Sequence, residues 1–218
     1  DWRVTALEFR GHGKSEGKRG HVKKWIHFFE DLQAAMATVG RPMALVGHSL
    51  GGLITLWSMM HPLTPKVKCV ALSNPLLGLS NKPSKRLVFF GKIAARIVPK
   101  LVVSRESQPE HLSRDPKVVQ DFIDDPLVSP DVTARMGQQT LKALKAVHAY
   151  APNYKSPLRL MLGGQDKVCD PIPAQQWAET YGGEISTIMY DQCYHELFNE
   201  PEKEQILEET ETWLNRYL

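Results

Sequence analysis

The chain has 218 residues, of which 42% are hydrophobic and 23% charged, values typical of a folded globular protein and not of a disordered or fibrous one. Its formal net charge of +3 is too small to indicate nucleic acid as a partner. No apolar run reaches the roughly 18 residues that a membrane-spanning helix needs.

Three cysteines, Cys69, Cys169 and Cys193, are sparse and lack metal-ligand spacing. They therefore predict neither a disulfide framework nor a metal site, and they favour a reducing, cytoplasmic compartment. The chain begins at Asp1 without an initiator Met, so a removed signal peptide stays open as an alternative.

Short apolar runs alternate with segments of helical period along the chain, which predicts an α/β fold with a mostly parallel sheet and helices on both faces. The amphipathic segment Trp25 to Val39, closed by Gly40, follows the first predicted strand, a helix to about Met60 follows the second, and a helix from about Pro201 ends the chain. The predicted strands are Val4 to Phe9, Met43 to Val46, Val67 to Leu72, Leu158 to Leu162 and Ile185 to Tyr190.

A long segment, Asn74 to Pro157, separates the third and fourth of these strands. Connections between a strand and a helix are normally only a few residues long, so this length predicts a helical cap or lid. The expected domain organisation is a core of residues 1–75, a cap of residues 76–156 and the rest of the core in residues 157–218.

The motif Gly47-x-Ser49-x-Gly51 lies between an apolar strand and a helix. In this context the serine sits on a strained turn that exposes its hydroxyl, and the glycines remove side chains that would collide there. The N–H of Leu50, at the helix start, is placed to bind a substrate oxyanion. Ser49 is therefore the predicted nucleophile.

An acid and a histidine follow in the order that this arrangement needs. Asp166 comes just after the fourth strand and is the predicted acid, with Asp170, beside Pro171, as the competing carboxylate. His195 comes in the loop after the last strand and is the predicted base. These roles predict acyl transfer from an ester through a covalent acyl-enzyme, with no cofactor and no metal. His48, His12 and Cys193 are interpreted as structural residues.

The segment Leu76 to Arg105 contains seven Lys or Arg and no Asp or Glu, interleaved with apolar residues. A basic amphipathic helix can lie on an anionic membrane surface. The competing interpretation is a cap helix that roofs a substrate pocket, and the two are compatible. We expect substrate contacts in this segment and peripheral contact with a membrane, while the sequence leaves the oligomeric state open.

The blocks FRGHGKSEGKRGHV, LVGHSLGG, LSNPLLGL, DDPLV, GGQDKVCDP and CYHELFNEPE resemble the monoacylglycerol lipase and lysophospholipase branch of the α/β-hydrolases. The resemblance implies an α/β-hydrolase fold with a cap over an acyl tunnel. It also implies that strands and a His-Gly loop, which supplies the second oxyanion N–H, precede Val4 in the family and are absent from this chain. Glu8 departs from the aspartate that the family usually has at that position.

The function expected on these grounds is hydrolysis of carboxylic esters of monoacylglycerols or lysophospholipids, with a small lipid ester as the substrate. Two alternatives stay open. One is another acyl hydrolase or a peptidase on the same scaffold, and the other is a non-catalytic binding protein of the same fold.

Overall fold

The computed structural model describes residues 2–39, 43–61, 67–104 and 108–218. These residues divide into two compact units. One unit draws on residues 1–40, 83–107 and 125–142, and the other on residues 41–82, 108–124 and 143–218. The predictions for Gly40, as the end of a helix, and for Arg105, in the basic segment, lie outside the described residues.

The second unit is built on a four-stranded parallel sheet of order β1-β2-β5-β6. Its strands are β1 (Met43–His48), β2 (Val67–Ser73), β5 (Leu158–Gly163) and β6 (Ile185–Tyr190). Four of the five predicted strands are therefore confirmed. Every residue of β5 is buried, because a parallel strand with neighbours on both sides is also covered on both faces.

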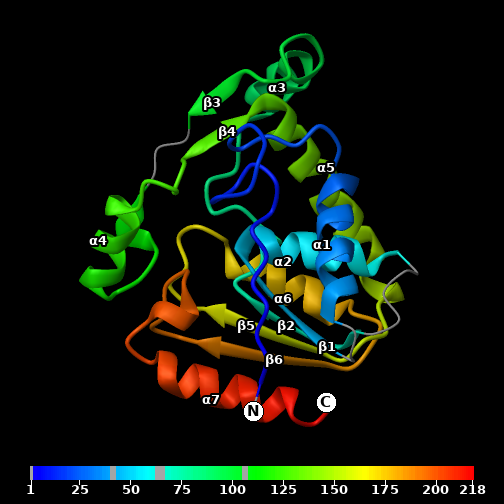
Figure 1. Ribbon diagram of the computed structural model, residues 1–218, viewed down its shortest axis with the longest axis vertical. Coiled ribbons are helices and arrows are strands. Elements are labelled where there is room, and N and C mark those ends of the chain that lie inside the picture. The colour runs from blue at the N-terminus through cyan, green and yellow to red at the C-terminus, as the bar shows by residue number, and fades with distance from the viewer. Residues whose placement is uncertain (1, 40–42, 62–66, 105–107) are drawn as a thin grey trace. The chain divides into compact units, whose positions relative to one another are not determined.

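Helices cover both faces of this sheet, as predicted. Helix α7 (Lys203–Leu214) lies on one face, and α2 (Ser49–Met59) and α6 (Pro171–Glu179) lie on the other (Figure 1). The α7 face is closed by a buried apolar cluster that includes Cys69, Met161, Cys193, Ile206 and Trp213. Cys193 is thus packed in the core, in agreement with its interpretation from the sequence as a structural residue.

The other unit contains α1 (Ile26–Val39), α3 (Lys85–Ile97), the first part of α5 (Ala134–Tyr150) and an antiparallel pair, β3 (Val102–Ser104) and β4 (Asp131–Thr133). Helix α1 buries Phe28, whose ring packs edge-on against those of Phe9 and Trp25. The remaining elements of the chain are short: η1 (Pro109–His111), α4 (Pro116–Asp124), η2 (Ala151–Asn153) and η3 (Leu197–Asn199).

The predicted strand Val4 to Phe9 is wrong. Residues 2–9 have no regular secondary structure, and Val4 is 87% exposed. An extended segment becomes a strand only when a neighbour completes its hydrogen-bond ladder, and none of the described residues pairs with this one.

In its described residues the long insertion contains three α-helices, as its pattern indicated, but also the β3–β4 pair, which its pattern did not indicate. Its placement as a cap over the site stays a prediction. Within the described part of the chain, no helix is both long and apolar enough to cross a bilayer.

Candidate active site

Ser49 lies at the junction of β1 and α2, and its backbone φ is +49°. A non-glycine residue in this left-handed region costs roughly 1–3 kcal/mol and is found where the surrounding structure enforces it, often at functional sites. The strained turn expected from the motif is therefore present. Leu50 follows in the first turn of α2, where backbone N–H groups have no acceptor within the helix.

The glycines around Ser49 differ in whether the protein leaves space for a side chain at their position. A Cβ atom on Gly47 would lie 2.8 Å from Thr55 Oγ1 and 2.9 Å from the Gly52 backbone, and one on Gly52 would lie 2.7 Å from Pro75 Cβ. A Cβ on Gly51 would meet nothing within 4 Å. The expected collision is confirmed at Gly47 and is wrong at Gly51, where the protein itself leaves space.

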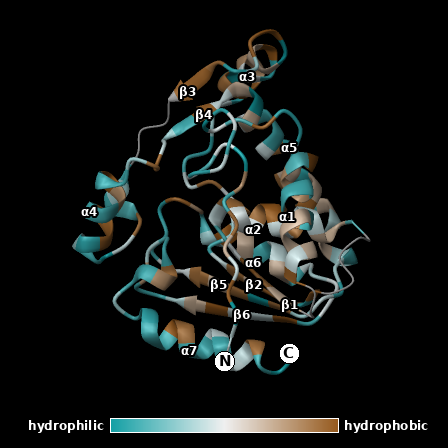
Figure 2. Cartoon of the chain, viewed as in Figure 1, coloured by the Kyte–Doolittle hydropathy of each residue, from teal (hydrophilic) through white to brown (hydrophobic). Residues whose placement is uncertain are grey.

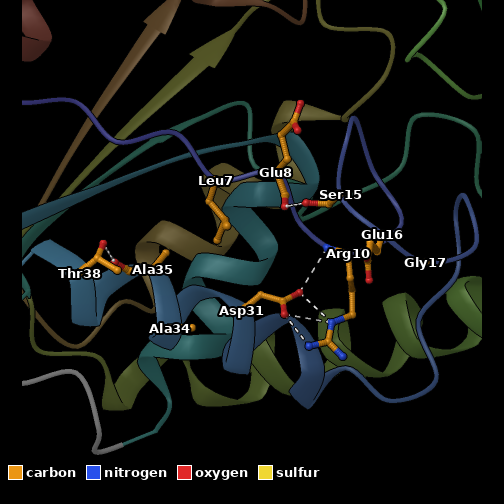
Figure 3. A pocket seen from close by; sticks show the side chains of 10 residues that line it. All are labelled: Leu7, Glu8, Arg10, Ser15, Glu16, Gly17, Asp31, Ala34, Ala35 and Thr38. Atoms are coloured by element: carbon orange, nitrogen blue, oxygen red, sulfur yellow. Dashed lines mark hydrogen bonds and ion pairs between the residues drawn. The ribbon is translucent and has the colours of Figure 1, made fainter.

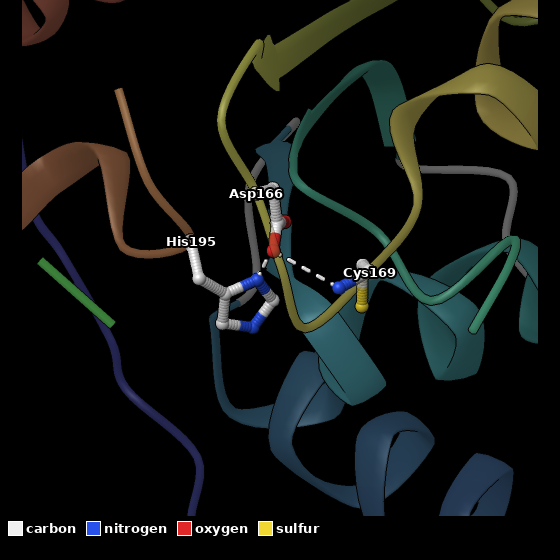
Figure 4. Close-up of side chains that lie close together, drawn as sticks. All are labelled: Asp166, Cys169 and His195. Atoms are coloured by element: carbon white, nitrogen blue, oxygen red, sulfur yellow. Dashed lines mark hydrogen bonds and ion pairs between the residues drawn. The ribbon is translucent and has the colours of Figure 1, made fainter. Parts of the chain in front are cut away.

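Asp166 and His195 come from the loops after β5 and β6, and the structure brings their side chains together (Figure 4). His195 Nδ1 lies 2.8 Å from Asp166 Oδ2. The other carboxylate oxygen, Oδ1, accepts hydrogen bonds from the backbone N–H groups of Val168 at 2.7 Å and Cys169 at 2.9 Å. A carboxylate held in this way keeps the proton on Nδ1 and leaves Nε2 to accept one.

Asp170 lies at a different kind of position. It is the N-cap of α6, and its side chain accepts a hydrogen bond from the Ile172 N–H at 3.0 Å. An aspartate at an N-cap satisfies an N–H that the helix itself cannot. This contact fits the loop-fixing role considered for Asp170 from the sequence.

The hydroxyl of Ser49 makes its contact with Cys169, at 4.0 Å between Oγ and Sγ, and not with His195 among the described residues. Hydrogen bonds between a nucleophile and its base are often long or misaligned before substrate binds. Ser49, Asp166 and His195 all follow carboxyl ends of strands in one sheet, so the three remain candidates for one site.

His48 packs against the predicted base, which the sequence did not indicate. The rings of His48 and His195 have centroids 4.7 Å apart, and His48 Nδ1 lies 3.0 Å from the backbone oxygen of Ser73. Burial, and next the charge that His195 can carry, lower the pKa of His48 to about 4. His48 is therefore neutral at neutral pH, donates to Ser73 and supports the His195 ring.

The loop that carries His195 is held by an ionic cluster with one buried member. Glu200 is fully buried, and its carboxylate accepts from the Arg114 backbone N–H at 2.7 Å and from Arg114 Nε at 2.6 Å. The Arg114 guanidinium also pairs with Glu202. Nearby, the Glu196 N–H donates to Leu112 O at 2.8 Å. The segment around Arg114 thus fixes the loop through backbone and side-chain bonds.

Arg114→Met should lower the free energy of unfolding by about 3 kcal/mol, because it leaves the buried Glu200 carboxylate without its cation. Urea titration followed by tryptophan fluorescence measures this change. Adding Glu200→Gln should restore most of the loss, since the uncompensated charge is then gone. Lys117→Met, which breaks the exposed Lys117–Asp121 pair, is the matched control and should have no measurable effect. Equal stability of Arg114→Met and the parent would contradict the role of the cluster.

Two groups of side chains in the described residues have the spacing of metal ligands. Asp166, Cys169 and His195 form one, and Cys193, Glu200 and Glu202 form the other. The first is engaged in the hydrogen bonds of the acid and base described above. The second already surrounds the Arg114 guanidinium, which occupies the position of a cation. Neither arrangement therefore calls for a metal ion.

A surface hollow of about 680 Å³ lies in the other unit (Figure 3). Arg10 and Asp31 both line this hollow and bind each other, with Arg10 Nε 2.8 Å from Asp31 Oδ2 and Nη2 2.5 Å from Oδ1. Its lining includes no nucleophile with a histidine beside it. An ion pair satisfied in this way does not provide acyl-transfer chemistry, so the hollow is not the predicted site.

The chain is similar in sequence and in structure to known proteins. The family model described as serine aminopeptidase, S33, matches residues 1–202. Monoglyceride lipase of Rattus norvegicus is 30% identical over 99% of this chain and 74% of its own length. Phospholipase YtpA of Bacillus subtilis is 26% identical over all of this chain and 86% of its own length. The crystal structure of Paleococcus ferrophilus monoacylglycerol lipase has a TM-score of 0.87 at 29% identity, over 98% of this chain and 83% of that one.

Proposed function

Because the chain belongs to the serine aminopeptidase S33 family and has the α/β-hydrolase fold, we propose that it is a serine hydrolase of lipid esters, acting on monoacylglycerols or lysophospholipids. The observation that carries the proposal is the buried His195–Asp166 pair, which lies at the same edge of the sheet as Ser49, a serine with positive φ. The relatives named as monoglyceride lipase and phospholipase support the class of substrate.

The proposed reaction has two halves. His195 Nε2 takes the proton of Ser49 as Oγ attacks the ester carbonyl, and the Leu50 N–H binds the oxyanion. Asp166 stabilises the imidazolium. The carbonyl then re-forms, the C–O bond to the alcohol breaks, and His195 gives its proton to that alcohol. In the second half, the same histidine deprotonates a water that attacks the acyl carbon. The bond to Ser49 Oγ then breaks, the fatty acid leaves, and His195 returns the proton to Ser49.

The substrate class is tested with a panel at equal concentration: a monoacylglycerol, a lysophosphatidylcholine, a triacylglycerol and an amino-acid p-nitroanilide. We expect the highest kcat/KM on one of the first two. The anilide tests for a peptidase, the alternative that the family's description favours. Preference for the anilide would overturn the proposed esterase, and an absence of hydrolysis of all four would favour the non-catalytic alternative.

We further propose that α3 brings the enzyme to an anionic membrane, as a peripheral protein of the cytoplasm. Ser84 is the N-cap of α3, and its side chain accepts a hydrogen bond from the Leu87 N–H. Large apolar side chains of the helix are exposed, while Ala95 is buried. Figure 2 shows hydrophobic residues along α3 and β3. The most exposed apolar residues in and just after this helix are Leu87, Phe89, Phe90, Ile97 and Val98.

Charge reversal of Lys82, Lys85 and Lys92 to glutamate should weaken binding to phosphatidylserine vesicles on the order of 100-fold. Each basic residue near such a surface contributes about 1 kcal/mol, and the difference should shrink as salt is raised. Vesicle sedimentation measures it. The control reverses three exposed lysines elsewhere, Lys68, Lys145 and Lys203, with the same change in net charge. Equal loss in both triple variants would mean that net charge, not α3, drives binding.

A further inference from the structure

Asn74 follows β2 directly, at the end of the sheet where the candidate acid and base also lie. It is 1% exposed and has a φ of +41°. Among the described residues, Ser49 and Asn74 are the non-glycine positions with positive φ. Asparagine tolerates this conformation better than most residues, but glycine adopts it without steric strain. The conformation alone therefore does not explain why an amide side chain is here.

The side chain of Asn74 joins the two loops that carry the acid and the base. Its Nδ2 donates to the backbone oxygens of His195, at 2.6 Å, and Tyr194, at 3.0 Å. Its Oδ1 accepts from the Gly163 N–H at 2.7 Å, three residues before Asp166. Both N–H donors of the amide and its carbonyl are used, and all three contacts are with backbone atoms.

The turn that carries the predicted nucleophile is hydrogen-bonded to the same segment after β2. The backbone N–H of Asn74 donates to Met161 O in β5 at 2.9 Å, and two residues later the Leu76 N–H donates to Ser49 O at 2.9 Å. The segment after β2 is thus bonded to the β1–α2 turn, to the end of β5 and to the loop after β6. Asn74 is the residue in it whose side chain bonds both to the end of the strand that precedes Asp166 and to the backbone of His195.

The packing makes the amide hard to replace. A Cβ atom on Gly163 would lie 2.2 Å from Tyr194 O and 2.7 Å from Cys193 O, so the strand end presses against a group of backbone carbonyls. In the described residues, the Asn74 amide supplies donors to two carbonyls of this loop. Removing the amide takes the donors away from these two carbonyls, and buried carbonyls without donors favour a shifted loop.

We propose that Asn74 is a positioning residue that sets the distance between His195 Nδ1 and Asp166 Oδ2 by holding the His195 peptide against the end of β5. The proposal rests on the proposed function in that it assigns His195 and Asp166 as the base and its acid. A side chain that acts through the base alters turnover, whereas one that acts on substrate alters KM.

The test is Asn74→Gly, which keeps the positive φ without strain and removes the amide. We expect kcat for p-nitrophenyl butyrate to fall about 100-fold, as for an ångström-scale misplacement of a catalytic group, with KM unchanged. Asn153→Gly, at an exposed position in η2, is the matched control for the added chain entropy. Full kcat in Asn74→Gly would overturn the proposal, because only the conformation would then matter.

Asn74→Asp is the second variant, in case the glycine variant does not fold. It keeps the shape and the acceptor for the Gly163 N–H, and it places an oxygen against the two carbonyls in place of the donors. The expected loss of kcat is at least that of the glycine variant. An aspartate variant with the parent's kcat would contradict the need for donors.

A spectroscopic measurement separates this proposal from the proposed function. A histidine Nδ1–H bonded to a carboxylate gives a far-downfield proton resonance, which Asp166→Asn assigns by removing it. The resonance should be present in the parent protein and shifted or broadened in Asn74→Gly. If the parent protein is inactive but its resonance is altered by Asn74→Gly, the proposed function is wrong and the positioning role of Asn74 still holds. An unchanged resonance in Asn74→Gly would contradict the positioning role of Asn74, whether or not the parent hydrolyses esters.

Discussion

Ser49→Ala is expected to lower kcat for ester hydrolysis on the order of 10⁶-fold, because removing a serine nucleophile disables the whole unit of nucleophile, base and acid. The variant should also lose labelling by a fluorophosphonate, which reacts with an activated serine. Steady-state assays with p-nitrophenyl esters and mass spectrometry of the labelled protein measure the two effects. The β1–Ser49–α2 turn should remain folded, since alanine removes one hydroxyl that makes a single long contact.

Ser129→Ala, at an exposed position outside the segment expected to contact substrate, is the control and should keep both activity and label. Labelling that survives Ser49→Ala, or that maps to another serine in the parent, would refute the assignment of the nucleophile.

Asp166→Asn should lower kcat on the order of 10⁴-fold, because an amide in place of the carboxylate holds the histidine in the wrong tautomer. The fold should tolerate the change. The Asn Oδ1 can still accept from the N–H groups of Val168 and Cys169, which Asp166 Oδ1 binds now. Measured kcat on a soluble ester, with thermal unfolding to verify folding, provides the test.

Asp170→Asn is the matched comparison, four residues further along the same loop. The Asp170 carboxylate caps α6 by accepting from the Ile172 N–H, and an asparagine oxygen can do the same. This variant should therefore retain nearly all activity. A larger loss from Asp170→Asn than from Asp166→Asn would reverse the assignment of the acid.

The strands of the parallel sheet could be predicted from the sequence because a strand buried on both faces is a short, nearly continuous apolar run. β5, with six buried residues, is the clearest example. The same reasoning failed at Val4 to Phe9, since composition can describe an extended segment but cannot supply its hydrogen-bonded neighbour. It also missed β3 and β4, because strands of three residues are too short to show a period.

The candidate site could be predicted in part for a related reason. Carboxyl ends of parallel strands meet at one edge of a sheet, so residues just after β1, β5 and β6 fall near one another in any such fold. This rule selects Asp166 and His195, which the structure brings to 2.8 Å. It cannot reveal Asn74, whose contacts are with backbone atoms far away in the sequence. Nor can it reveal Arg114, because pairing with Glu200 depends on where a long insertion returns to the sheet.

The contact between Gly163–Gly164 and the residues after β6 has a consequence for protein engineering. A Cβ on Gly164 would lie 2.7 Å from Asp191 O, and one on Gly163 would lie 2.2 Å from Tyr194 O. The end of β5 and the loop after β6, which are separated in sequence by α6 and β6, therefore pack backbone against backbone. Chimeras that graft a relative's β6 loop onto this chain need the recipient's glycine pair to be retained, or the donor's β5 end to be moved with it. The two loops form one exchangeable cassette, and recombination breakpoints between them should yield mostly inactive proteins.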